Sequence, residues 1–108
     1  MMAEDIARRA AELVGGDRAA THGDKRQNHD NIAALWTAFL AVRKEPTSPL
    51  SGRDVAAMMV LLKLARMETG AFNPDDAVDA IGYAAILGQL DSEDAAIDIP
   101  PVAAQMGD

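Results

Sequence analysis

The chain has 108 residues, of which 49% are apolar and only 4% aromatic, and its formal net charge is −7 with a pI near 4.6. This acidity argues against binding of a nucleic-acid polymer, although one local group of cations could still bind a small nucleotide. The absence of cysteine excludes disulfides, thiolate zinc sites and cysteine nucleophiles. No apolar run is long enough to span a membrane and no signal-peptide core is found, so we expect a cytoplasmic protein without a membrane partner.

The composition predicts an all-α fold. Alanine is abundant and β-branched residues are sparse outside short clusters, which favours helices over sheets. The length fits one domain, but a domain of this size buries only a modest core. We therefore expect a homo-oligomer, either a dimer or a larger assembly.

The N-terminal half predicts two helices separated by a polar loop. Residues 3–14 place apolar side chains on one face at helical spacing and are followed by two glycines, which are typical of a helix end. Residues 17–27 are polar and lack periodicity, which is typical of a loop. Residues 28–44 carry an apolar stripe that includes Trp36, so we expect the second helix there.

The C-terminal half predicts two further helices. Ser51 and Asp54 form a capping-box pattern that opens a third helix at about residues 53–69. This segment is apolar nearly all round, which is typical of a central, buried helix. Asn73 and Pro74 form a strong start for the fourth helix, with Asn73 as the N-cap and Pro74 at the first helical position.

The helical pattern fails after the fourth helix, which we expect to end at about Leu90. The residues that follow are acidic, and Pro100-Pro101 blocks a helix. We therefore divide the chain into a helical domain at 1–90 and a flexible acidic tail, or an arm that contacts another subunit, at 91–108.

Two cations interrupt the apolar third helix. Lys63 and Arg66 are three residues apart, so they share a side of that helix. Their charged ends could reach solvent or pair with acids that fix the register of two helices. Alternatively, they could bind the phosphate or carboxylate oxygens of a ligand.

Acidic residues on the fourth helix face one side, followed one turn later by Tyr83. Asp75 and Asp76 suit the first turn because acids there offset the helix dipole. Asp79 lies beyond the first turn, and it is either a structural partner of the cations or a metal ligand. Converging carboxylates suit a hard divalent cation such as Mg²⁺, which could support phosphoanhydride hydrolysis.

Four polar residues cluster around the loop before the second helix, namely His22, Asp24, Asn28 and His29. Either histidine could contact a base or a phosphate, or could lie in solvent. Asn28 could contact the same ligand or cap the second helix. Two histidines are too few for a histidine-rich metal site.

Together these motifs resemble the small phage and prophage proteins grouped with the MazG-like, all-α nucleoside triphosphate pyrophosphohydrolases. The resemblance covers roughly residues 17–90 and rests on four segments in order: His22-Gly23-Asp24 with Asn28, the helix segment 32–36, Asp54 with 58–63 and Arg66, and Asn73 through Asp75, Asp76, Val78, Asp79 and Gly82 to Tyr83. It implies a four-helix MazG-like bundle completed by homo-oligomerisation. It also implies a nucleotide substrate and Mg²⁺-dependent attack of water on the α–β phosphoanhydride, which releases pyrophosphate.

The resemblance further implies roles for individual residues. The family's metal ligands are an E-x-x-E pair on one helix and an E-x-x-D pair on the next. Asp76-x-x-Asp79 resembles the second pair, which makes Asp76 and Asp79 the implied metal ligands and catalytic residues, whereas Lys63-x-x-Arg66 stands where the first pair is expected. The implied substrate-binding residues are Lys63, Arg66, Tyr83, His22, Asp24 and Asn28.

Three functions remain open from the sequence. The first is a Mg²⁺-dependent nucleotide pyrophosphohydrolase, and the second is a non-catalytic phage protein that binds, and so sequesters, a nucleotide on the same scaffold. In the second, cations bind phosphate directly. The third is a structural or interaction module, in which Lys63 and Arg66 form buried salt bridges with Asp76 and Asp79.

Overall fold

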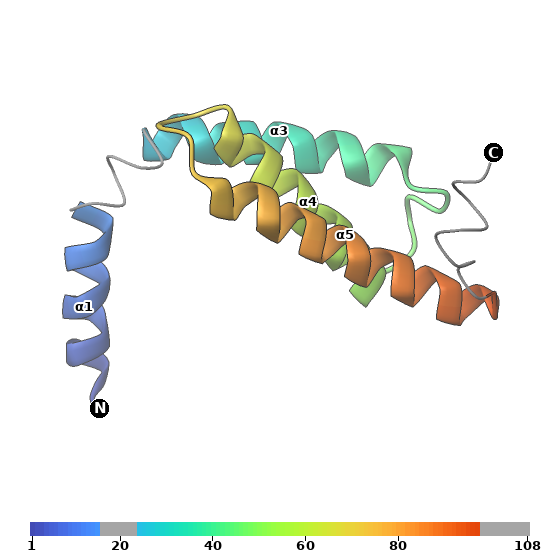
Figure 1. Cartoon of the computed structure of the whole chain (residues 1–108), viewed down its shortest axis with the longest axis horizontal. Coiled ribbons are helices and arrows are strands. Elements are labelled where there is room, and N and C mark those ends of the chain that lie inside the picture. Colours follow the sequence, from blue (N-terminus) through green and yellow to red (C-terminus); the bar gives the residue numbers. More distant parts are fainter. Residues whose placement is uncertain (16–23, 98–108) are drawn as a thin grey trace.

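Four helices make up the part of the chain that the computed structural model describes, which is residues 1–15 and 24–97. They are α1 (Ala3–Gly15), α3 (Lys25–Val42), α4 (Gly52–Met67) and α5 (Pro74–Ala95), and these two ranges contain no strand (Figure 1). The predicted all-α fold is therefore confirmed. None of the described helices is both long and apolar enough to cross a membrane.

The start of α3 differs from the predicted one. Asp24 is the N-cap, and its Oδ1 atom accepts hydrogen bonds from the backbone N–H groups of Arg26 (2.8 Å) and Gln27 (3.3 Å). The helix therefore begins about one turn before the predicted start at residue 28. The prediction missed this first turn because its residues are polar and carry no apolar periodicity. Asn28 lies inside α3 and does not cap it.

The starts of the next two helices confirm the predicted caps. Asp54 Oδ2 accepts hydrogen bonds from the backbone N–H (3.0 Å) and the hydroxyl (3.2 Å) of Ser51 at the start of α4. At the start of α5, Asn73 Oδ1 accepts a hydrogen bond from the backbone N–H of Asp75 at 3.0 Å, and Pro74 is the first helical residue.

The end of α5 also differs from the predicted one. The helix continues to Ala95, five residues beyond the predicted end, and stops where Ala96 adopts a left-handed conformation with φ of 55°. Asp91 is anchored to Arg53 of α4, which gives this acidic turn a fixed partner. The first part of the predicted tail is thus helical, and residues 98–108 lie outside the described residues.

The three helices α3, α4 and α5 form a single layer with α4 in the middle (Figure 1). α4 packs extensively against α5 and less extensively against α3, while α3 and α5 have at most marginal contact. Trp36 joins α3 to α4, because its indole N–H donates a hydrogen bond to the carbonyl of Met58 at 2.8 Å. The predicted central position of α4 is therefore confirmed.

The core of this layer is small. The buried apolar residues among those described are Ile32, Ala56 and Ala65, two of which are alanines. α4 is also less buried than predicted, because Val55 and Leu64 are about half exposed. A single layer of helices covers two sides of its middle helix and leaves the other two sides open.

Candidate functional site

The acids of α5 point at the lysine of α4. Lys63 Nζ lies 2.9 Å from Asp79 Oδ2 and 4.0 Å from Asp76 Oδ1. Lys63 and Asp76 are buried, whereas the side chain of Asp79 is 46% exposed. The structure thus brings together three of the residues singled out in the sequence, and the closest contact is a direct ion pair.

This arrangement does not fit the implied magnesium site. The ammonium group of Lys63 lies between the two carboxylates, where a cation bound to both would have to lie. Within residues 1–15 and 24–97, no group of three or more His, Asp or Glu side chains is placed to hold a metal ion. Mg²⁺ prefers octahedral oxygen ligation, and two carboxylates already paired with Lys63 supply little of it.

Arg66 has a different environment from Lys63. Its side chain is partly buried, and its Nε atom is fully buried without a hydrogen-bond partner. No ion pair joins Arg66 to any other described residue. A buried polar N–H without a partner costs about 1–3 kcal/mol, and more when the group is charged. Such a group in a folded protein calls for a specific explanation, such as a bound ion or ligand.

Further polar groups gather at the same end of the layer, which we call the Lys63–Arg66 end. It comprises Lys63, Arg66, Asp76, Asp79 and the buried Asn28, which is tied to the end of α4 because Asn28 Oδ1 accepts a hydrogen bond from the Thr69 hydroxyl at 3.4 Å. The N-termini of α3 and α5 lie at this end, beside the C-terminus of α4 (Figure 1). Helix N-termini favour anions because their free N–H groups and dipoles are positive outward.

The other predicted ligand-binding residues have varied positions. Tyr83 is partly buried on α5, one turn beyond Asp79. Asp24 is exposed, and its carboxylate is used to cap α3. His29 is exposed, with its Nδ1 atom 2.7 Å from the carbonyl oxygen of Lys25. His22 lies outside the described residues.

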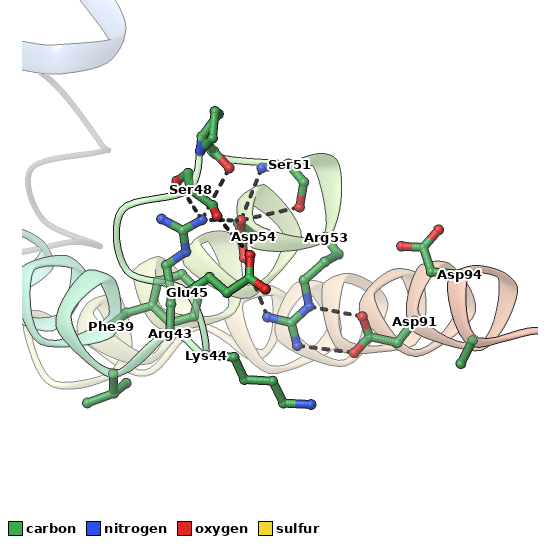
Figure 2. A pocket seen from close by; sticks show the side chains of 13 residues that line it. Phe39, Arg43, Lys44, Glu45, Ser48, Ser51, Arg53, Asp54, Asp91 and Asp94 are labelled. Carbon is green, nitrogen blue, oxygen red and sulfur yellow. Dashed lines mark hydrogen bonds and ion pairs between the residues drawn. The ribbon is translucent and has the colours of Figure 1, made fainter.

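A second cluster, at the opposite end of α4, was missed in the sequence. We call it the Arg43–Asp91 network, and it comprises Arg43, Asp54, Arg53 and Asp91 (Figure 2). Asp54 lies 3.2 Å from Arg43 Nη2 and 3.6 Å from Arg53 Nη1. Arg53 in turn donates two hydrogen bonds to Asp91, from Nε at 3.0 Å and from Nη2 at 3.1 Å. The network joins the end of α3, the start of α4 and the last turns of α5.

Arg43 also holds the loop between α3 and α4. Its Nη2 group donates hydrogen bonds to the backbone carbonyls of Ser48 (2.9 Å) and Pro49 (3.2 Å). The side chains of Arg43 and Asp54 are each only 9% exposed, so this pair is well shielded from water. The sequence feature that could have indicated this contact is an arginine at a helix end followed by a proline-rich loop. The backbone carbonyls of such a loop cannot accept hydrogen bonds from a continuing helix, so they need other donors.

The network shifts the pKa values of its members. The backbone hydrogen bond from Ser51 holds the pKa of Asp54 below its ordinary value, and the nearby charge of Arg43 lowers it further. The hydrogen bond from Arg53 lowers the pKa of Asp91. The same bond raises the pKa of the Arg53 guanidinium. All three shifts favour the charged forms.

An open hollow of about 930 Å³ lies beside this network (Figure 2). Its charged lining is mixed, with Arg43, Lys44 and Arg53 facing Glu45, Asp54, Asp91 and Asp94. Arg43 and Arg53 are already paired with acids, so they offer an anionic ligand little unmatched charge.

The chain is similar to one described protein family and to proteins of two mycobacteriophages. The family described as "Domain of unknown function (DUF6378)" matches residues 5–91. The Gene 55 protein of Mycobacterium phage L5 is 41% identical over 81 residues, which is 75% of this chain and 49% of that protein. The Gene 55 protein of Mycobacterium phage D29 is 34% identical over 92 residues, which is 85% of this chain and 57% of that protein. No solved structure matches the chain.

These matches confirm the predicted similarity to phage proteins, and neither relative's name states an activity or a MazG-like relationship. The chain spans about half the length of the curated relatives it matches. Because the family match covers most of the chain, the protein belongs to the DUF6378 family.

Proposed function

We propose that this protein binds a nucleotide through its phosphate groups at the Lys63–Arg66 end, without a metal ion and without hydrolysing the ligand. The observation that carries the proposal is the buried Nε atom of Arg66, which has no partner among the described residues. A phosphate oxygen would supply that partner through a charge-assisted hydrogen bond.

The charges around Arg66 support an anionic ligand. Lys63 pairs with Asp79 and Asp76, whereas Arg66 forms no ion pair with a described acid. Arg66 then carries a positive charge that is not paired in the described part of the chain. Arginine suits phosphate better than lysine does, because its planar fork can donate two parallel hydrogen bonds.

A nucleotide suits this end better than a bare phosphate ion. Tyr83 lies one turn beyond Asp79 and supplies an aromatic ring against which a base can stack. The amide group of Asn28 offers donors and an acceptor near the end of α4. The resemblance to MazG-like proteins points to the same ligand class.

Hydrolysis is the weaker alternative. It would require Mg²⁺ to displace the ammonium group of Lys63 from between Asp76 and Asp79, or Lys63 to move away on ligand binding. A purely structural role explains the contacts of Lys63, but it leaves the buried Nε atom of Arg66 unexplained.

Thermal-shift measurements with a nucleotide panel test the proposal. The panel contains nucleoside mono- and triphosphates, cyclic dinucleotides and inorganic phosphate, each with Mg²⁺ or with EDTA. A ligand present at 100 times its Kd should stabilise the protein by about 2.7 kcal/mol. We expect at least one nucleotide to raise the Tm equally with Mg²⁺ and with EDTA.

The matched variants are Arg66→Gln and Lys44→Gln. Lys44 is an exposed cation at the opposite end of the layer, beside the Arg43–Asp91 network, so its substitution should leave the nucleotide effect intact, whereas Arg66→Gln should abolish it. The absence of any shift across the panel would refute nucleotide binding. Release of pyrophosphate from a triphosphate with Mg²⁺ would instead establish hydrolysis.

A further inference from the structure

Lys63 has two acidic neighbours on α5, and they differ in burial. Asp79 Oδ2 lies 2.9 Å from Lys63 Nζ, whereas Asp76 Oδ1 lies 4.0 Å from the same atom. The side chain of Asp79 is 46% exposed, and that of Asp76 is only 5% exposed. The shorter ion pair of Lys63 is therefore made by the acid that can turn more easily to solvent.

Asp76 is held beside Lys63 by its position in the fold. It lies in the first turn of α5, where the positive end of the helix dipole stabilises a carboxylate. It is also among the most buried residues of the described chain. One buried carboxylate is enough to balance the charge of one buried ammonium group. Asp76 is therefore the fixed counterion of Lys63.

Asp79 has neither of these supports. It lies beyond the first turn of α5, where the effect of the helix dipole has faded. Its ion pair with Lys63 is open to water on the side of the acid, and a pair of this kind contributes little to stability. Another anion can therefore displace Asp79 from Lys63 at a small cost.

We propose that Asp79 is a displaceable counterion, which a phosphate group of the ligand replaces on Lys63, so that Asp79 sets the affinity of the Lys63–Arg66 end. The inference rests on the nucleotide binding proposed above and names the regulation of that same site. In the free protein the carboxylate of Asp79 occupies the ammonium group. In the bound protein a phosphate oxygen takes that position, and the side chain of Asp79 turns to solvent.

The charge balance of the Lys63–Arg66 end supports this exchange. Its charged residues are two cations and two acids, namely Lys63, Arg66, Asp76 and Asp79. While Asp79 stays in place, these charges cancel and a phosphate meets no net attraction. Once Asp79 has turned to solvent, one unit of positive charge is left to attract an anion.

The spacing of the two cations lets one ligand bind both. Lys63 and Arg66 lie three residues apart on α4, which places their Cβ atoms about 5–6 Å apart on one side of the helix. Arg66 Nε has no hydrogen-bond partner among the described residues, and Lys63 gains an open position when Asp79 leaves. The oxygens of one phosphate, or of two adjacent phosphates, can then accept hydrogen bonds from both side chains.

The test repeats the nucleotide panel on the full-length Asp79→Asn variant. Nucleoside mono- and triphosphates, cyclic dinucleotides and inorganic phosphate are added in EDTA, and the Kd is measured by isothermal titration calorimetry. Asparagine keeps the size of the side chain but lacks the charge that holds Lys63. We expect the Kd of Asp79→Asn to be about 5- to 10-fold lower than that of the wild type, because no carboxylate competes with the phosphate or repels it.

Two variants serve as matched controls. Asp75→Asn removes one carboxylate from the first turn of the same helix, at an exposed position without an ion pair among the described residues. Because that charge is screened by salt, the Kd should change by less than about 2-fold in 0.15 M NaCl. Asp79→Glu retains a carboxylate that can reach Lys63, so its Kd should return close to that of the wild type.

Failure of this inference can be told apart from failure of the proposed function. The absence of binding to both the wild type and Asp79→Asn would refute nucleotide binding and the exchange together. A wild type that binds a panel member at least as tightly as Asp79→Asn would refute the exchange alone. Equal tightening by Asp75→Asn and Asp79→Asn would also refute it, because the effect would then come from net charge.

A second variant covers the case in which Asp79→Asn fails to fold. Asp79→Ala also removes the carboxylate, and alanine is the residue that best favours a helix. It should lower the Kd as Asp79→Asn does. Loss of the folded state in both variants would overturn the proposal, because Asp79 would then be a required structural partner of Lys63 in the free protein.

Discussion

The two ends of the α4–α5 pair use the same kinds of residues to different effect. At the Arg43–Asp91 network, each arginine has a carboxylate within 3.2 Å and the shielded Arg43 also binds two backbone carbonyls. At the Lys63–Arg66 end, one cation is paired and the other has a buried N–H without a partner in the described chain. At the Arg43–Asp91 network both arginines are paired with carboxylates. At the Lys63–Arg66 end Arg66 has no ion-pair partner among the described residues, so its positive charge is available to an anionic ligand.

Arg43→Met should have the largest effect on stability, because it disrupts the Arg43–Asp91 network, in which both arginines are paired. The change removes the donors to Ser48 and Pro49 and leaves the shielded Asp54 with a weaker partner. We expect a loss of about 2–4 kcal/mol in the free energy of unfolding, measured by urea denaturation. Lys44→Met, at the exposed neighbouring position, should change it by less than about 0.5 kcal/mol. Equal effects of the two changes would show that the network does not hold the loop.

Lys63→Met should have the next largest effect. It leaves Asp76, which is 3% exposed, without the cation that balances its charge. We expect a loss of about 2–3 kcal/mol in the free energy of unfolding. Adding Asp76→Asn to Lys63→Met should recover part of that loss, because the unbalanced charge is then absent. A double variant less stable than Lys63→Met would contradict a charge-balancing role.

The acid side of the stability profile should depend on the Arg43–Asp91 network. The folded-state pKa values of Asp54 and Asp91 lie below the ordinary 3.8, so the unfolded chain binds these protons first as pH falls. Their stabilising contribution is therefore full above about pH 5 and is lost as pH drops below about 4. Asp91→Asn should flatten this part of a plot of Tm against pH. An unchanged slope would mean that Asp91 does not contribute.

Arg66→Met should have the smallest effect on stability and the clearest effect on function. Methionine fills similar space without a buried N–H that needs a partner, so the free energy of unfolding should stay equal or rise by up to about 1 kcal/mol. The nucleotide-induced rise in Tm should disappear. A large loss of stability without any ligand would show that Arg66 has a structural partner and would weaken the proposed function.

The helices were largely predictable from the sequence because their caps act locally. Ser51 with Asp54, and Asn73 with Pro74, mark the starts of α4 and α5 within one turn. The helix boundaries that were predicted wrongly depend on weak sequence patterns or on contacts between distant residues. The polar first turn of α3 carries no apolar pattern, and the last turn of α5 is held by a contact between Arg53 and Asp91, 38 residues apart.

The candidate site was predictable in part for the same reason. Helical spacing was enough to predict that Lys63 faces Asp76 and Asp79. It could not show whether Lys63 or Arg66 forms the ion pairs with these two acids. The Arg43–Asp91 network was missed because its four members come from three helices. The path of the loop after α3, which brings Arg43 close to the start of α4, cannot be read from local residue patterns.

The positions of the two ends along the chain have a consequence for the order of folding. Lys63 and Asp76 flank the short connection between α4 and α5, so their pairing closes a small loop, whereas Arg53 and Asp91 close a much longer one. Short loops close with a smaller entropy loss. We therefore expect the Lys63–Arg66 end of the helical hairpin to form early, with Lys63→Met slowing refolding and Asp91→Asn mainly accelerating unfolding.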